Sequence, residues 1–159
     1  MLTISPPLAC REPREVIVKR DAEQENAAVT ILLVDDEPQI LRLVSNILED
    51  YNILTASTGS EAILRSNQYK NEIDLLLSDF EMPGMTGMEL AAQITVARPK
   101  IKVLLMSGYT GGMLVLNEGW HFLAKPFIPS QLRSLVQAVT SQQQEVIRNI
   151  TVEESYEKR

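Results

Sequence analysis

Four charged side chains in this sequence directly follow short apolar runs. The runs and the residues after them are 29–34 before Asp35 and Asp36, 74–78 before Asp79, and 120–124 before Lys125. Short apolar runs are typical of parallel strands that are buried on both faces of a sheet. Because ligands of such sheets collect at the carboxyl ends of the strands, three carboxylates and one ammonium are expected to meet there.

This set of residues predicts chemistry with phosphate. Carboxylates that lie close together repel one another unless a cation neutralises them. Hard oxygen ligands suit Mg²⁺, which also binds phosphate oxygens, and a carboxylate beside Mg²⁺ can attack a phosphoryl group to give an acyl phosphate. Lys125 would pair with one phosphate oxygen. The hydroxyl of Ser107, which follows the apolar run 102–106, would donate to another.

The segments between these runs carry helix signals. Pro38 suits a first helical turn, and apolar side chains recur at helical spacing over 38–49. Thr58 with Glu61 and Thr86 with Glu89 have the spacing of helix caps. Further elements are expected as a strand at 53–56 and as helices ending near 68, spanning 87–97 and beginning near 129. Alternating strands and helices predict an α/β fold with a parallel sheet and helices on both faces.

Composition narrows the possible partners and location. The 159 residues suit one domain, and the net charge of -6 argues against nucleic acid as a partner. Cys10 is the only cysteine, so no internal disulfide is possible, which fits a reducing compartment. The sequence shows neither an export signal nor an apolar stretch long enough for a membrane span, so a cytoplasmic location without membrane contact is expected.

The chain is expected to divide into three parts. Residues 1–28 contain three prolines and a polar run, and they predict a flexible extension before a domain at 29–140. Residues 141–159 are expected either as a disordered tail or as a continuation of the last helix. Leu132, Val139 and Val146 are spaced by seven, so a helix that continued to about residue 150 would offer a surface for a homodimer.

The motifs, taken together and in this order, resemble the receiver domain of two-component response regulators. They are Asp35-Asp36-Glu37, Asp79 with Met82-Pro83-Gly84 and Gly87, Ser107-Gly108-Tyr109, and Lys125-Pro126-Phe127. The resemblance covers residues 29 to about 140 and includes the single-domain, CheY-like type and the receivers of hybrid histidine kinases. It implies a flavodoxin-like fold with a five-stranded parallel sheet. It also implies a cytoplasmic phosphoprotein of signal transduction that takes a phosphoryl group from a histidine kinase or a phosphotransfer protein.

The resemblance assigns roles to the strand-end residues. Asp79 would be the phosphoacceptor, and Lys125 would bind the phosphoryl group. Asp36 would bind Mg²⁺ directly, whereas Asp35 would act mainly through water. Asp79 and the backbone carbonyl of Glu81 would complete the protein ligands.

Further roles concern the switch and the lifetime of the phosphoryl group. Ser107 would be the hydroxyl that is drawn toward the phosphate, and Phe122 would be the aromatic side chain that swings inward behind it. Glu81 and Tyr109 would influence the access of the attacking water, with Tyr109 expected to shield the site. The family implies two packings of similar energy, one of which phosphorylation favours.

The sequence departs from the family between Ser107 and Lys125. This segment is about one helical turn short, so the fourth helix, within 111–117, is expected to be brief. Gly111 and Gly112 disfavour its start. Because the family uses that helix and the last strand and helix for output, recognition of a downstream partner, which the sequence does not identify, is expected to be altered.

Two other functions remain open on the sequence. A phosphohydrolase of the haloacid dehalogenase kind also uses an Asp nucleophile, Mg²⁺, a hydroxyl and a Lys, but its nucleophile follows the first strand. A pseudo-receiver would keep the fold as a binding module without phosphorylation, against which the intact Asp36, Asp79 and Lys125 argue. A receiver promotes its own phosphorylation and dephosphorylation and is not a conventional enzyme.

Overall fold

The computed structural model describes residues 28–108 and 119–141. Within them the order of elements is β1 (Thr30–Val34), α1 (Pro38–Ile47), β2 (Asn52–Ala56), α2 (Gly59–Gln68), β3 (Leu75–Asp79), α3 (Gly87–Ala97), β4 (Lys102–Ser107), β5 (Trp120–Ala124) and α4 (Pro129–Thr140). The predicted extension before residue 28, the short helix within 111–117, Tyr109 and the helix beyond residue 141 lie outside the described residues.

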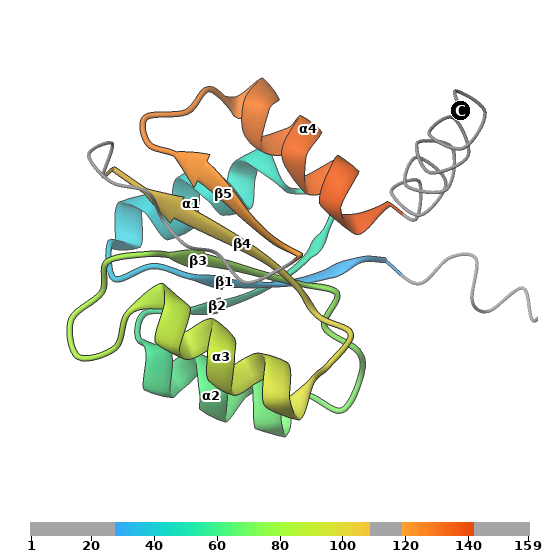
Figure 1. Ribbon diagram of the computed structural model, residues 1–159. Coiled ribbons are helices and arrows are strands. Elements are labelled where there is room, and N and C mark those ends of the chain that lie inside the picture. Colours follow the sequence, from blue (N-terminus) through green and yellow to red (C-terminus); the bar gives the residue numbers. More distant parts are fainter. Residues whose placement is uncertain (1–27, 109–118, 142–159) are drawn as a thin grey trace, which may run out of the picture.

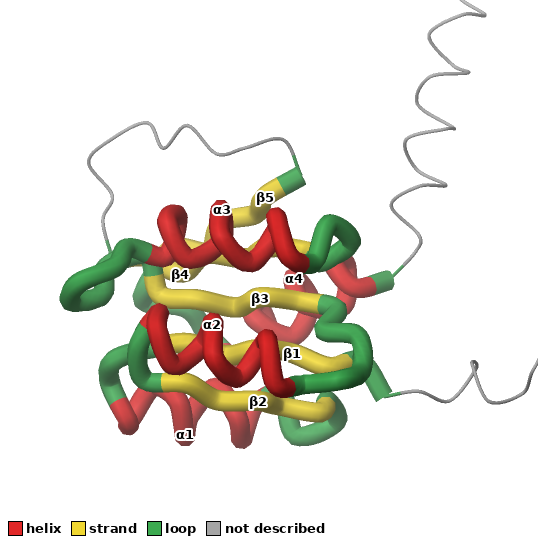
Figure 2. The backbone as a smooth tube through the Cα atoms, turned by 90° about the horizontal axis from the view of Figure 1, so that it is seen from below, coloured by secondary structure: helices red, strands yellow, loops and turns green. Residues whose placement is uncertain are grey.

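The strands form one parallel sheet in the order β2-β1-β3-β4-β5 (Figure 2). This is the order of flavodoxin-like folds, as the sequence predicts. Helices α2 and α3 cover one face of the sheet, and α1 and α4 cover the other (Figure 1). The direction in which successive strands are added to the sheet reverses between β1 and β3. In such sheets, ligands bind at the carboxyl ends of the strands on either side of this point, and Asp35, Asp36 and Asp79 lie there.

Two apolar clusters hold the layers together. One lies between the sheet and the pair α2 and α3 and contains Leu32, Val34, Leu76, Leu90, Ile94 and Leu105. The other lies between the sheet and the pair α1 and α4 and contains Ile31, Leu33, Val44, Leu77, Leu132 and Val136. Because side chains alternate between the faces of a strand, the continuous apolar runs of β1 and β3 serve both clusters.

The prediction of burial on both faces is wrong for β5. Strands β1 and β3 are buried at every position, whereas the residues of β5 are half-buried and its last residue, Ala124, is exposed. The sheet order explains the difference, because β5 is an edge strand with only β4 beside it. An apolar run alone does not distinguish a central strand from an edge strand.

The predicted helix caps are confirmed. The Thr58 side chain accepts a hydrogen bond from Glu61 N at 3.1 Å, and Thr86 and Glu89 form a reciprocal capping box at the start of α3. Helix α1 begins at Pro38 as expected and ends at Ile47, two residues before the predicted end. Over 28–108 and 119–141, the helices are all too short or too polar to cross a membrane.

An arginine that the sequence did not single out joins the ends of α2 and α3. Arg98 caps the C-terminus of α3 and donates from Nη2 to the carbonyls of Ser66 (2.8 Å) and Tyr69 (2.7 Å). It also donates from Nη1 to Asn71 O at 2.9 Å. The last carbonyls of a helix lack partners within that helix and attract positive charge, so Arg98 stabilises the C-terminal end of α2.

Replacing Arg98 by alanine is therefore expected to lower the free energy of unfolding by about 2 kcal/mol, since several carbonyls lose a charged donor. Arg65→Ala is the matched control. Among the described residues, the side chain of Arg65 contacts Glu61 in an exposed ion pair within α2, which is worth about 0.5 kcal/mol or less. Urea unfolding of both variants measures the difference, and equal losses would contradict this role of Arg98.

Candidate functional site at the carboxyl ends of the strands

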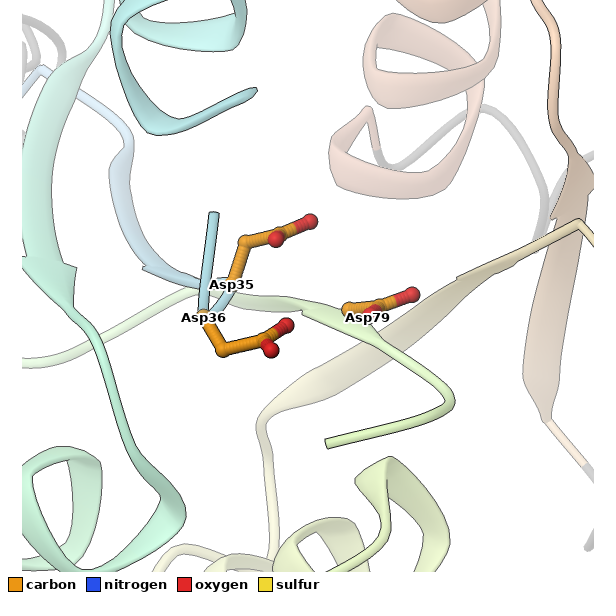
Figure 3. Close-up of side chains that lie close together, drawn as sticks. All are labelled: Asp35, Asp36 and Asp79. Carbon is orange, nitrogen blue, oxygen red and sulfur yellow. The ribbon is translucent and has the colours of Figure 1, made fainter. Parts of the chain in front are cut away.

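Three carboxylates meet at one edge of the sheet. Asp35 and Asp36 directly follow β1, and Asp79 is the last residue of the neighbouring strand β3. One carboxylate oxygen from each lies within 4.8 Å of the others. Figure 3 shows the three side chains next to one another at the ends of their strands. The convergence predicted from the apolar runs is what the fold produces.

Lys125 joins two of these carboxylates. Its Nζ lies 3.2 Å from Asp35 Oδ2 and 3.1 Å from Asp79 Oδ1. Strand pairing brings it there, because Ser107 at the end of β4 pairs with Ala124, and Lys125 N donates to Ser107 O at 2.7 Å. The Lys125–Pro126 peptide bond is cis. The paired ends of β4 and β5 thus place Lys125 beside Asp35 and Asp79.

The three carboxylates differ in exposure. Asp35 is fully buried, and its second oxygen accepts a hydrogen bond from Glu37 N at 2.9 Å. Asp79 is 6% exposed, whereas Asp36 is exposed. Asp35 thus has protein partners for both oxygens, while Asp36 faces solvent. A cation that arrives from water therefore meets Asp36 first.

Burial sets the electrostatics of the site. It raises the pKa of Asp79, and Asp35 and Asp36 add to the rise, while the hydrogen bond and charge of Lys125 offset only part of it. Burial also acts to lower the pKa of Lys125, but attraction to Asp35 and Asp79 outweighs it, so this pKa lies above its ordinary value. Lys125 is therefore charged at neutral pH, and Asp79 holds its proton more tightly than an exposed aspartate does.

The raised pKa of Asp79 predicts a pH-dependent effect on stability. The folded protein binds the proton more tightly than the unfolded chain, so this contribution is present below the ordinary pKa of 3.8 and is lost as pH rises through the folded pKa. In Mg²⁺-free buffer at neutral pH, Asp79→Asn is expected to melt at or above the wild-type temperature. The advantage should shrink as pH falls toward 3.8.

Thermal melts between neutral and acidic pH measure this effect. Asp50→Asn serves as the control, because the Asp50 side chain is 78% exposed. A melting temperature of Asp79→Asn below that of wild type at neutral pH would show that the ion pair with Lys125 outweighs burial and would contradict the prediction.

The loop between β3 and α3 passes next to Asp79. It contains Glu81, which is exposed, and Gly84, whose φ of 81° suits glycine. At its end, Gly87 N donates to Phe80 O at 2.9 Å. A Cβ on Gly87 would collide with the backbone carbonyl oxygen of Asp79, so only glycine allows this close approach. The motif residues Gly84 and Gly87 therefore shape the turn beside the site.

The two residues of the predicted switch lie on neighbouring strands, two register positions apart. Ser107 is 1% exposed and ends β4, while Phe122 is half-buried in β5 and pairs with Leu105. Leu105 and Ser107 are two residues apart, so their side chains lie on the same side of the sheet as Phe122. Phe122 packs against the cluster under α2 and α3.

The donor set fits Mg²⁺. It consists of carboxylate oxygens only, three of them within 4.8 Å, with one carboxylate open to solvent. Mg²⁺ prefers hard oxygen ligands, few of them from protein, and keeps several waters. The partial neutralisation by Lys125 leaves the cluster with a net negative charge, which attracts a divalent cation.

One contact at the site was not expected from the sequence. Asp35 was predicted to act through water, but its ion pair with Lys125 makes it part of the support of that lysine. The sequence feature that could have predicted this contact is the position of Asp35 directly after a fully buried strand at the centre of the sheet. A carboxylate in that position needs a charged partner.

Comparison with known proteins agrees with this geometry. The family model described as the response regulator receiver domain matches residues 31–137. The hydrogenase transcriptional regulatory protein HoxA of Cupriavidus necator is 32% identical over 71% of this chain and 24% of its own length. The sensor kinase CckA of Brucella abortus is 29% identical over 86% of this chain and 15% of its own length. The chain thus spans a quarter or less of either relative.

A solved structure shares the fold. The response regulator protein TrrA from Thermotoga maritima, in complex with Mg²⁺ and BeF, has a TM-score of 0.62 and 31% identity. The match covers 70% of this chain and 98% of that one. The range matched by the family model, residues 31–137, contains Asp35, Asp36, Asp79 and Lys125.

Proposed function

The chain belongs to the response regulator receiver domain family, and on this premise we propose that it accepts a phosphoryl group on Asp79 in a Mg²⁺-dependent reaction. The observation that carries the proposal is the contact of Lys125 with Asp79 beside Asp35 and Asp36. A buried carboxylate that touches an ammonium and lies next to a cation site has the groups that phosphoryl transfer requires.

Each residue of the site has a defined part in this reaction. A carboxylate oxygen of Asp79 forms a bond to phosphorus while the bond from phosphorus to the donor breaks, and the donor atom keeps the electron pair. Lys125 neutralises charge on the phosphoryl oxygens. Asp36, Asp79 and the Glu81 carbonyl would hold Mg²⁺ directly, with Asp35 acting through water. When bound, Mg²⁺ would supply charge stabilisation to the carboxylates and the phosphoryl oxygens.

The product changes the charge at the site, which provides a switch. An acyl phosphate on Asp79 adds oxygens that accept hydrogen bonds from Lys125 and from the hydroxyl of Ser107. Movement of Ser107 toward them would vacate space on the side of the sheet where Phe122 packs, and Phe122 would move inward. Glu81 and Tyr109 would set the lifetime of the acyl phosphate through access of water.

The donor and the readout of this switch follow from the family. A phosphohistidine on a histidine kinase or a phosphotransfer protein would supply the phosphoryl group, as suits a domain that resembles part of a sensor kinase. The domain would span 29–140 and act in the cytoplasm through protein contacts. If the last helix continues beyond residue 141, as the spacing of Leu132, Val139 and Val146 predicts, it would mediate a homodimer. The chain would promote its own phosphorylation and dephosphorylation without turning over a separate substrate.

Incubation with Mg²⁺ and a small phosphodonor, followed by intact mass measurement, tests the proposal. We expect one phosphoryl group on the wild type, none when Mg²⁺ is chelated and none on Asp79→Asn. The adduct should be labile to acid and base, as an acyl phosphate is. An unmodified wild type would favour the pseudo-receiver, and rapid turnover of phosphate monoesters would favour a phosphohydrolase.

A further inference from the structure

Side chains hold the middle of the loop between β3 and α3. The backbone hydrogen bonds of this loop lie at its ends, from Phe80 N to Met106 O (2.7 Å) and from Gly87 N to Phe80 O (2.9 Å). Between these ends, Met82 is buried in the cluster under α2 and α3, and Met85 is half-buried against the same cluster. Between its ends, the loop is thus anchored to the core by two methionines, and Thr86 is held by its hydrogen bonds with Glu89.

Met85 lies against the first turn of α2. A Cβ on Gly59, the first residue of α2, would lie 2.6 Å from Met85 Sδ and 3.2 Å from Met85 Cβ and Cγ. The Met85 side chain thus occupies the space that a larger residue at position 59 would need. Gln93 Nε2 of α3 lies 4.0 Å from the same sulfur. Met85 therefore connects the loop to both helices on this face of the sheet.

We propose that Met85 is a positioning residue for the cation site, because its contact with Gly59 fixes the loop and with it the backbone carbonyl of Glu81. This inference rests on the proposed function, in which that carbonyl is a Mg²⁺ ligand. Asp35, Asp36 and Asp79 are fixed by β1 and β3, whereas the Glu81 carbonyl belongs to the loop. Mg²⁺ demands near-ideal octahedral geometry, so a loop displaced by about 0.5 Å weakens binding while the sheet is unchanged.

Simple core packing is the alternative role, and the chain offers a matched control for it. Met88 lies in α3, is half-buried and packs against the same cluster as Met85. Truncation of either methionine removes a half-buried side chain of the same type from the same core. Met85 belongs to the loop, whereas Met88 belongs to α3, so only Met85→Ala truncates a side chain of the loop itself.

Calorimetric titration of the full chain with Mg²⁺ distinguishes these roles. Met85→Ala is expected to weaken binding about three- to tenfold, a size typical of the coupling between contacting groups. Met85→Leu, which conserves volume, should stay within about twofold of wild type, as should Met88→Ala. Unchanged affinity in Met85→Ala, or an equal loss in Met88→Ala, would overturn the proposal.

Gly59 permits a second, independent test. Gly59→Ala adds a methyl group where Met85 lies and leaves a better helix former in α2, so it should weaken Mg²⁺ binding without loss of helix stability. In the Met85→Ala background, the added methyl group enters vacated space and should cause no further loss. An equal effect of Gly59→Ala in both backgrounds would mean that the two residues act separately, against the proposal.

Amide hydrogen exchange in Mg²⁺-free buffer gives a readout that does not depend on the cation. The amides of Thr86 and Gly87, which donate to Glu89 Oε2 and Phe80 O, should exchange faster in Met85→Ala than in wild type, and those in Met88→Ala should not. Equal exchange in all three proteins would overturn the fixing of the loop by Met85. If the wild type binds no Mg²⁺, the proposed function and the proposed effect of Met85 on Mg²⁺ binding are both overturned. The hydrogen-exchange rates would still decide whether Met85 fixes the loop.

Discussion

Replacement of Lys125 by methionine is expected to lower the free energy of unfolding of the Mg²⁺-free protein by about 3 kcal/mol, because breaking a buried ion pair leaves uncompensated charge. The side chain of Lys125 is 20% exposed, and the side chains of its partners Asp35 and Asp79 are 0% and 9% exposed. Methionine keeps most of the apolar stem and removes only the ammonium. The loss of stability therefore measures the effect of removing the charge and not the effect of creating a cavity.

Two further measurements identify the source of this loss. In Lys125→Met, Mg²⁺ should restore more stability than it adds to wild type, since it neutralises the same carboxylates. Adding Asp79→Asn should also recover part of the loss, because one of the two unpaired carboxylates is then gone. Urea unfolding with and without Mg²⁺ measures both effects. Strictly additive substitutions would show that Lys125 and Asp79 do not interact.

The other large effect is expected at Gly87. In Gly87→Ala the new Cβ would collide with the backbone oxygen of Asp79 and approach Phe80 Cα to 3.1 Å. Backbone atoms do not rotate away as a side chain does, so the end of β3 or the start of α3 must shift. We expect a loss of about 3 kcal/mol in the free energy of unfolding, at the upper end for overpacking. Phosphorylation should also slow, because Asp79 itself is displaced.

Gly84→Ala is the control for Gly87→Ala in the same loop. Gly84 has a φ of 81°, but a Cβ there would meet no atom within 4 Å. The cost should therefore be limited to the left-handed conformation, about 1 kcal/mol. Thermal and urea unfolding of the two variants separate a steric effect from a conformational one. Comparable losses would argue against the collision with Asp79.

Much of the fold follows from local signals in the sequence. The apolar runs of β1 and β3 predict central strands because a parallel sheet covered on both faces buries every position. Thr58 and Thr86 mark helix starts because their hydroxyls satisfy free backbone N–H groups. The convergence of Asp35 with Asp79 needs only the rule that the carboxyl ends of parallel strands share an edge.

Features that depend on contacts between residues far apart in the sequence could not be predicted from local sequence patterns. The half-exposure of β5 depends on its edge position, which the composition of the run does not encode. The contacts of Arg98 with α2 join residues about thirty positions apart, and no local pattern signals them. The contact of Met85 with Gly59 depends likewise on how the loop crosses the first turn of α2.

At the site, too, the residue types and strand-end positions were predictable from the sequence, whereas one contact between distant residues was not. The types of its residues and their places at strand ends were predicted, and the structure brings Asp35, Asp36, Asp79 and Lys125 together. The ion pair of Lys125 with Asp35 was not predicted, because it depends on the depth of Asp35 in the sheet. The roles of Ser107, Phe122 and Glu81 remain proposals that rest on the family.

The central claim is that Asp79 carries the phosphoryl group, and trapping the acyl phosphate tests it most directly. The protein is incubated with Mg²⁺ and a small phosphodonor and then reduced with borohydride, which converts an aspartyl phosphate to homoserine. Peptide mass mapping then locates the converted residue. We predict homoserine at position 79 and at no other aspartate, with none formed when Mg²⁺ is chelated. Conversion of Asp35 or Asp36 instead, or a phosphoryl group that resists reduction, would contradict the account.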